Sequence, residues 1–218
     1  MEDNFTLDYY QKCICLAQEQ GYEFITSTQA IDVSYPPEKL VFIMRHDVDH
    51  NLDLAVRMAQ LENKLNISST YYFRTQARNY NVFSWPNIKL IHMIKDFGHE
   101  IGYHYELPLS TTNENRQFFT YNVHLLRLTF GMDTIRTICP HEPTRVAAGD
   151  VINASLRKHL HITCDAYDAI LMDRFKYISD SSCRWREGPL HKHITARKSL
   201  YVLTHPVWWY ENNPGECY

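Results

Sequence analysis

Apolar runs alternate with helical periodicities along most of this chain. Runs of large apolar and β-branched residues predict short buried strands, and they lie at 40–44, 70–73, 100–103, 134–138, 161–164, 176–179 and 200–204. Stretches with apolar residues three and four positions apart predict amphipathic helices between them, at 3–20, 51–65, 86–97, 111–130 and 150–159. This alternation is typical of right-handed strand–helix–strand units around a mostly parallel sheet.

Capping residues support several of these helix boundaries. Asn51 can cap the helix that follows it, and Pro86 suits the first turn of the next one. Thr111 and Glu114 have the spacing of a capping box. The local signals therefore agree with the periodicity about where these helices begin.

The chain length narrows the fold class. A complete eightfold barrel needs about 250 residues, whereas this chain has 218. We therefore predict an α/β fold in which mostly parallel strands form a distorted or incomplete (β/α) barrel. No repeat, low-complexity segment or linker divides the sequence, so residues 1–218 are expected to form a single domain.

Composition excludes several classes of partner. The formal net charge is −3 without a long charge run, which argues against a nucleic-acid or anionic membrane surface. No apolar stretch approaches a membrane span, and the acidic N-terminus lacks a signal-peptide pattern. The six cysteines are scattered without a C-x-x-C pair and are most simply reduced thiols. These features together predict a cytoplasmic protein.

Two carboxylates directly follow the first apolar strand. They are Asp47 and Asp49 in the sequence Arg-His-Asp-Val-Asp-His, which ends at His50. Residues two apart in a strand point to the same side, so both acids can enter one pocket. Buried carboxylates require a cation, a proton or hydrogen-bond donors. The flanking histidines favour a metal, and the alternative is a loop of solvated acids beside a helix cap.

Three more histidines follow other predicted strands. His104, His141 and His205 each fall near the carboxyl end of a strand, where parallel α/β folds bind ligands. Imidazole and carboxylate ligands together suit zinc, whereas an imidazole beside indoles can serve as a proton donor. Each histidine could instead be structural. Trp208 and Trp209 are adjacent and point opposite ways in an extended chain, so at most one can stack on a sugar.

Other polar residues have simpler explanations. His99 precedes a strand and is expected to be a structural hydrogen-bonding residue, and the pair His191 and His193 lies in a polar, solvated stretch. Cys139 is expected to be structural, since no activated Cys–His arrangement is evident. Arg45 could pair with a site acid or contact a substrate.

Taken together, the order and spacing of these clusters resemble the polysaccharide deacetylase family, of the carbohydrate esterase family four type, in a divergent branch. The resemblance extends over nearly the whole chain. The segments that carry it are Arg45–Asp49, Thr70–Arg74, Gly98–Glu106, Ser179–Asp180 with Trp185, and His205–Pro206.

The resemblance implies a role for each matching residue. Asp47 would be the catalytic base, Asp49 and His104 would bind the metal, and His205 would be the general acid. The family's chemistry is hydrolysis of an N-acetyl, or sometimes O-acetyl, group on a sugar, with a divalent metal that is most often zinc.

The second metal-binding histidine of the family is missing. Its position, four residues after His104, holds Pro108, which cannot coordinate a metal. We expect His141 to complete the site from another loop, with Glu106 or His50 as less favoured substitutes.

The family's arginine-containing third motif is also not recognisable around His141. Arg74 and Asp180 could replace its organising role. We expect substrate contacts from these two residues and from Tyr105 and Trp208.

Two alternatives to a metal-dependent deacetylase remain open. Relatives hydrolyse other non-peptide C–N bonds, including cyclic ureides, sometimes without a metal. A catalytically inactive carbohydrate-binding protein is the third possibility, although a pure binder needs no acid–base pair such as Asp47 and His205.

Overall fold

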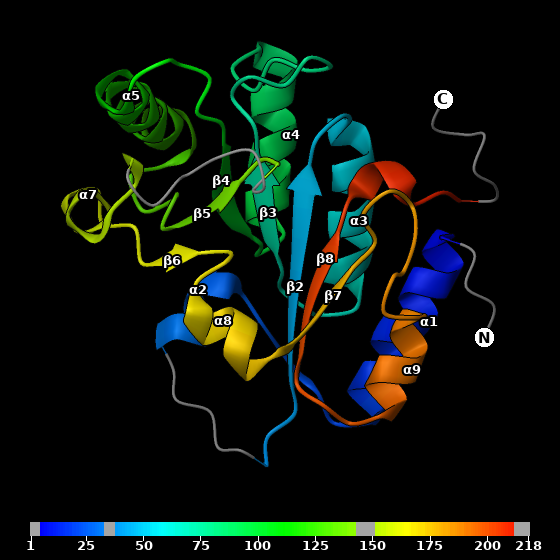
Figure 1. The fold of residues 1–218 in the computed structure, drawn as a ribbon. Helices are drawn as coiled ribbons and strands as arrows, with labels where there is room; N and C mark the ends of the chain where they lie inside the picture. Colours follow the sequence, from blue (N-terminus) through cyan, green and yellow to red (C-terminus); the bar gives the residue numbers. More distant parts are fainter. Residues whose placement is uncertain (1–4, 33–37, 143–150, 212–218) are drawn as a thin grey trace.

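A parallel sheet that curls without closing organises this protein (Figure 1). The computed structural model describes residues 5–32, 38–142 and 151–211. The strand order is β6-β5-β4-β3-β2-β8-β7, with β1 also paired to β2, and every pairing is parallel. The strands are β1 Glu23–Ile25, β2 Val41–Val48, β3 Thr70–Phe73, β4 Glu100–Tyr105, β5 Thr137–Pro140, β6 Cys164–Asp165, β7 Lys176–Ser179 and β8 Leu200–Thr204. Within the described ranges β6 and β7 do not pair, so the predicted incomplete barrel is confirmed.

Strand β2 lies at the centre of the sheet, and all eight of its residues are buried. It pairs with β8 on one side. On the other side it pairs first with β1, over 41–43, and then with β3, over 45–48. The strand is longer than the predicted run 40–44, because pairing with β3 continues it through Val48. Asp47 therefore lies inside the strand, and only Asp49 follows it.

Helices cover the sheet and confirm the predicted alternation (Figure 1). The helices are α1 Leu7–Glu19, α2 Ser27–Asp32, α3 Leu52–Lys64, α4 Trp85–Asp96, α5 Thr112–Phe130, α7 Ala154–His159, α8 Ala169–Arg174, α9 Leu190–Thr195 and the 3₁₀ turn η2 Pro206–Trp208. Asn51 caps α3 by accepting from the Asp53 N–H, and Thr111 and Glu114 form the predicted capping box of α5. The sequence patterns missed β1, α2, α8 and α9, all of them short.

Side-chain alternation along the strands separates the two faces of the sheet. On one face, a cluster of β3 and β4 packs against α3, α4 and α5, and a neighbouring cluster of β2 and β8 packs against α1 and α9. The opposite face holds smaller clusters, one of β1, β2 and β8 with α2 and α8, and one around Tyr72. Gly102 in β4 makes room for that ring, because a Cβ at Gly102 would lie 2.5 Å from Tyr72 Cδ1.

No described helix combines the length and apolar character that a membrane crossing requires. The five cysteines within the described ranges are all free thiols.

Candidate active site

Three residues from three strands meet at the carboxyl edge of the sheet. Asp49 follows β2, His104 lies near the end of β4, and His141 follows β5. Asp49 Oδ1 is 3.4 Å from His104 Nε2 and 3.7 Å from His141 Nε2. One ligand atom from each residue lies within 4.8 Å of the others, a spacing that can hold a metal ion.

Asp49 Oδ1 is the atom that most needs a partner. It is buried and accepts no hydrogen bond from any described residue. Burial alone would raise the pKa of Asp49, but the imidazoles of His104, His205 and His141 outweigh it and lower this pKa. An anionic oxygen without a donor, faced by two imidazoles, fits a divalent cation with a preference for mixed oxygen and nitrogen ligands.

Strand register fixes the orientation of His104. His104 lies opposite Cys139 in the β4–β5 pairing, and its Nδ1 is 3.0 Å from the Cys139 carbonyl oxygen. A carbonyl can only accept, so Nδ1 carries the proton and Nε2 faces the carboxylates. Burial lowers the pKa of His104, but Asp47 and Asp49 outweigh it and raise this pKa. A metal at Nε2 would compete with a proton there.

His141 lies in the loop after β5, near Pro108, where the family's second metal-binding histidine was expected. The His141 N–H donates to the Tyr105 carbonyl at 2.8 Å, and its Nδ1 is 3.4 Å from Glu106 Oε1. Pro108 lines the same cavity. The other suggested substitute, His50, is exposed and its ring pairs with Asn79 instead.

Arg74 pairs with acids of the site. Its Nε donates to Glu106 Oε1 at 2.7 Å, and its Nη1 is 3.6 Å from Asp49 Oδ1. Glu106 is thereby held by Arg74 and is a weaker candidate for a metal ligand. The guanidinium also lines the cavity, so it can contact a substrate as well as hold Glu106.

Asp47 lies deeper than Asp49 and is held by residues on its own side of the sheet. Arg45 is fully buried, and its Nη2 is 3.4 Å from Asp47 Oδ2. The Cys139 thiol points at both Asp47 oxygens, at 3.7 and 3.8 Å. His104 Nε2 is 3.8 Å from Asp47 Oδ2. Asp47 therefore accepts a hydrogen bond from its arginine, whereas Arg74 stays 3.6 Å from Asp49 Oδ1 and forms no hydrogen bond with it.

A second possible metal group shares His104 and adds Asp47 and Cys139. Asp47 already accepts a hydrogen bond from Arg45, whereas Asp49 Oδ1 accepts none from any described residue. Burial also raises the pKa of the Cys139 thiol, so the thiolate that a metal prefers is disfavoured. The group with Asp49 and His141 is therefore the better metal site.

His205 directly follows β8 and lies at the same carboxyl edge of the sheet. Its Nδ1 is 2.6 Å from Asp180 Oδ1, and its backbone N–H donates to Asp180 Oδ2 at 2.9 Å. Its Nε2 points back to the site, 3.9 Å from Asp49 Oδ2. Burial lowers the pKa of His205, but Asp180 outweighs it and raises this pKa. The Trp209 indole N–H donates to the same carboxylate at 3.0 Å.

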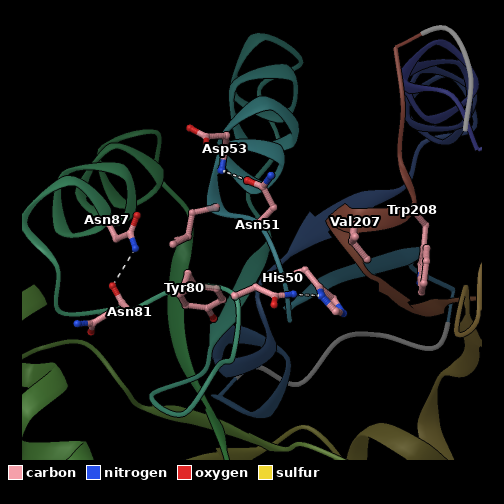
Figure 2. Close-up of a pocket in the computed structure, with 10 residues that line it drawn as sticks. His50, Asn51, Asp53, Tyr80, Asn81, Asn87, Val207 and Trp208 are labelled. Atoms are coloured by element: carbon pink, nitrogen blue, oxygen red, sulfur yellow. Dashed lines mark hydrogen bonds between the residues drawn. The ribbon is translucent and has the colours of Figure 1, made fainter. Parts of the chain in front are cut away.

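The structure corrects two predicted substrate contacts. Asp180 is fully buried and holds His205, so it acts on the position of another side chain. Tyr105 alternates with His104 along β4 and therefore points into the opposite, helix-covered core, where it is 1% exposed and packs on Phe119. Tyr105 therefore does not line the cavity at the metal group. Trp208 lines a neighbouring cavity (Figure 2), whereas Trp209 is core.

Sequence reasoning expected Cys139 to be structural and missed its contact with Asp47. Its thiol contact with Asp47 depends on the pairing of β4 with β5, which no local pattern reveals. The pairing of Arg45 with Asp47 was one of two options, and their spacing of two residues on a strand was the signal for it. His99 is structural as expected, with Nε2 3.0 Å from the Ala59 carbonyl oxygen.

The fold of the chain resembles that of solved deacetylases. The Streptococcus pyogenes deacetylase PplD in complex with acetate aligns with a TM-score of 0.55 and 13% identity, over 95% of this chain and 83% of that one. The chitin deacetylase of the fungal pathogen Colletotrichum lindemuthianum aligns with a TM-score of 0.50 and 11% identity, over 84% and 83%.

A third neighbour is a carbohydrate esterase family four pseudoenzyme from Bacillus anthracis, with a TM-score of 0.55 and 16% identity over 78% of this chain. A mutant of this pseudoenzyme with restored enzymatic activity aligns equally well. The present chain spans 56–58% of the length of these two proteins. No protein-family model and no curated protein sequence matches the chain.

Proposed function

Because this chain has the fold of the carbohydrate esterase family four deacetylases, we propose that it is a metal-dependent hydrolase. It would remove an acetyl group from an N-acetylated or O-acetylated sugar or glycan precursor. The fold alone does not decide activity, since its structural neighbours include both deacetylases and a pseudoenzyme. The proposal therefore depends on the site residues at the carboxyl edge of the sheet.

One observation carries the proposal. A buried Asp49 oxygen without a hydrogen bond faces His104 and His141, and the Asp47 carboxylate and the His205 imidazole stand beside them. A binding protein has no need for a buried acid and an imidazole held on either side of a ligand site. Metal-assisted acyl hydrolysis uses both.

We assign the metal to Asp49, His104 and His141, with zinc as the favoured ion because of the mixed nitrogen and oxygen ligands. When bound, such an ion would polarise the acyl oxygen and make a nearby water more acidic. The His104 Nδ1–H donates to the Cys139 carbonyl oxygen, so the Nε2 lone pair is available without rearrangement.

Asp47 would take the proton of the attacking water. Its carboxylate is fixed by Arg45 and by the Cys139 thiol, so it need not reorient during the reaction. His205 would donate a proton to the leaving amine or alkoxide. Its Nδ1–H is committed to Asp180, which leaves Nε2 for the substrate. Each acid–base role contributes about 10²–10⁴ in rate.

The test combines metal analysis with acetate release from a panel of acetylated sugars. Zinc should copurify with the wild type and be lost in Asp49→Ala. Asp47→Asn should keep the zinc and lose at least about 10²-fold in acetate release. Asp133→Asn and His124→Ala, at exposed positions away from the site, are the matched controls and should behave as wild type. Full activity in Asp47→Asn, or full zinc content in Asp49→Ala, would refute the assignments.

The same experiment separates the alternatives. Turnover of a cyclic ureide or another amide without bound metal would favour a different C–N hydrolase. Glycan binding without metal or turnover would favour an inactive carbohydrate-binding protein. A cytoplasmic location and a single domain over 1–218 remain predictions from the sequence.

A further inference from the structure

Helix α5 carries large apolar side chains on two of its sides. Its inner side belongs to the hydrophobic cluster that it shares with β3 and β4. The helix lies at one margin of the molecule (Figure 1), and four more apolar side chains on it and just beyond its end are exposed to solvent. These residues, here called the α5 stripe, are Tyr121, Leu125, Leu128 and Met132, with exposed fractions between 46% and 76%. Folding of the monomer explains the inner side but not the stripe.

The spacing of the α5 stripe is that of a helix–helix contact. Its residues follow one another at intervals of four, three and four positions. On a helix this spacing gives a single line of side chains, the seam through which two helices pack. Eight large apolar side chains are exposed in the part of the chain that the structure describes, and four of them belong to the stripe. Single exposed apolar residues are ordinary, whereas a continuous line of them marks an interaction surface.

The outer surface of α5 also carries little charge. Between Glu114 and Asp133 the sequence has two charged residues, Arg116 and Arg127. Each of these arginines donates through Nε to a backbone carbonyl oxygen, at 3.0 and 3.1 Å, so both are directed along the protein and not outward. Depletion of charge around an apolar line is typical of the centre of a protein interface. Such a surface can meet a copy of itself without repulsion between like charges.

The exposed area is sufficient for a weak dimer. With the exposed fractions given above, the α5 stripe presents about 500 Å² of side chain, as much as the largest apolar patch of an ordinary monomer. Two copies packed through the stripe would bury about 1,000 Å² of it, which is near the lower limit for a specific interface. The neutral side chains beside the stripe would add a polar border.

We propose that this chain forms a two-fold symmetric dimer in which α5 packs antiparallel against α5 of a second copy. The two-fold axis passes near Leu125, the middle of the exposed helical residues. Tyr121 then packs on the partner's Leu128, and the same contact recurs on the other side of the axis. The antiparallel arrangement places the positive end of each helix dipole beside the negative end of the other, whereas a parallel pair would bring like ends together.

This dimer keeps the two candidate active sites apart. Helix α5 begins after β4, at the carboxyl edge of the sheet, and ends before β5, at the opposite edge. An antiparallel pair therefore directs the carboxyl edges of the two copies in opposite directions. Each site is complete within its own copy, so dimerisation is independent of the proposed function.

Sedimentation equilibrium of the full chain tests the proposal. The wild type should dimerise with a Kd on the order of 10 µM. Leu128→Glu should weaken dimerisation at least about 100-fold, because a two-fold dimer loses the contact twice. The side chain is 76% exposed in the monomer, so urea unfolding of the dilute variant should match the wild type. Ile170→Glu, at a 45% exposed apolar position on α8, is the matched control and should dimerise as the wild type does.

A charge pair tests the antiparallel register. Tyr121→Glu combined with Leu128→Lys places opposite charges against each other across the interface. Tyr121→Glu combined with Leu128→Glu places like charges there. Residues seven positions apart on one helix are not neighbours, so neither combination forms an ion pair within a copy. The first double variant should dimerise at least about tenfold more tightly than the second.

Several results would overturn the proposal. They are a wild type that stays monomeric at about 100 µM, tenfold above the expected Kd, undiminished dimerisation of Leu128→Glu, and equal affinities for the two double variants. A wild type that is monomeric and binds a different protein through the stripe would also reject the second copy as the occupant. Zinc content and acetate release of Leu128→Glu should equal those of the wild type, so a failure of the dimer and a failure of the deacetylase assignment are separate outcomes.

Discussion

The Asp180 carboxylate holds His205 at two points, its backbone N–H and its Nδ1. The two residues are brought together by the pairing of β7 with β8. The double contact fixes both the ring orientation and the tautomer, and it leaves Nε2 directed at the site. Asp180 is therefore a positioning residue.

Asp180→Asn should lower kcat by about 10–100-fold with little change in fold. Loss of the negative charge also lowers the pKa of His205, because Asp180 is the main group that raises it. The alkaline limb of the pH–rate profile, where the general acid loses its proton, should move to lower pH. Asp173→Asn, at an exposed position on α8, is the control. An unshifted alkaline limb would mean that Asp180 does not act through His205.

His141→Ala should weaken zinc binding by at least about 100-fold, since a ligand is lost outright. Pro108→Ala, at the position where the family's histidine is expected, should leave zinc affinity unchanged. Competition with a zinc-binding dye measures both. Equal affinities in the two variants would show that His141 does not replace the missing ligand.

Arg45→Met should destabilise the protein by about 3–5 kcal/mol, because it leaves Asp47 buried without its ion-pair partner. The guanidinium also donates to the Tyr167 hydroxyl at 2.9 Å and the Tyr201 hydroxyl at 3.1 Å, and these contacts are lost as well. Urea unfolding of the variant, beside the exposed control Arg186→Met, gives the difference. A change below about 1 kcal/mol would contradict a structural role for this pair.

A second buried carboxylate, Glu62, lies on the helix-covered side of β2. It accepts hydrogen bonds from Tyr10, from Ser69 at 2.5 Å and from Tyr71 at 2.7 Å, and it is 2.9 Å from His46 Nε2. Glu62→Gln replaces one acceptor oxygen with a donor and should cost about 3 kcal/mol of stability. Glu19→Gln, exposed on α1, should cost almost nothing. Equal unfolding free energies for the two variants would rule out this network as a stabilising element.

Stability should also depend on pH through Glu62. Burial would raise its pKa, but His46 and other donors outweigh it and lower this pKa from 4.5 to about 2. A carboxyl group whose pKa is lower in the folded protein contributes its full stabilisation at pH values above the pKa that it has in the unfolded chain. On the order of 3 kcal/mol is therefore lost as pH falls from 4.5 to about 2. In the same window Glu62→Gln should lose less stability than wild type, and parallel curves would contradict this.

Much of the fold could be predicted from the sequence, because the patterns that mark its longer strands and helices involve residues close together along the chain. The apolar run before Arg45, the Asn51 cap and the Thr111 capping box depend on residues close in sequence, and all are present in the structure. The sequence patterns did not reveal α2, α8 and α9, which have six residues each and therefore show little periodicity.

For the same reason, the residues of the site could be predicted better than the orientations of their neighbours. The acids and histidines at strand ends were identifiable, since parallel strands bring their carboxyl ends to one edge. The prediction that Tyr105 contacts the substrate was wrong, although the sequence shows that Tyr105 and His104 are adjacent on a strand and so point to opposite faces. Which of Trp208 and Trp209 faces a cavity depends on how η2 packs, and no pattern within the turn could decide it.

The sequence by itself determined the alternation of the longer strands and helices and the chemical groups that end the strands, because both depend on neighbours along the chain. Only the tertiary structure decided that Cys139 and Arg45 flank Asp47, that Asp180 holds His205, and that Trp208 borders a neighbouring cavity. Those relationships depend on which strands pair and in what register. That choice is set by packing among residues far apart in sequence, which a single chain read from end to end does not reveal.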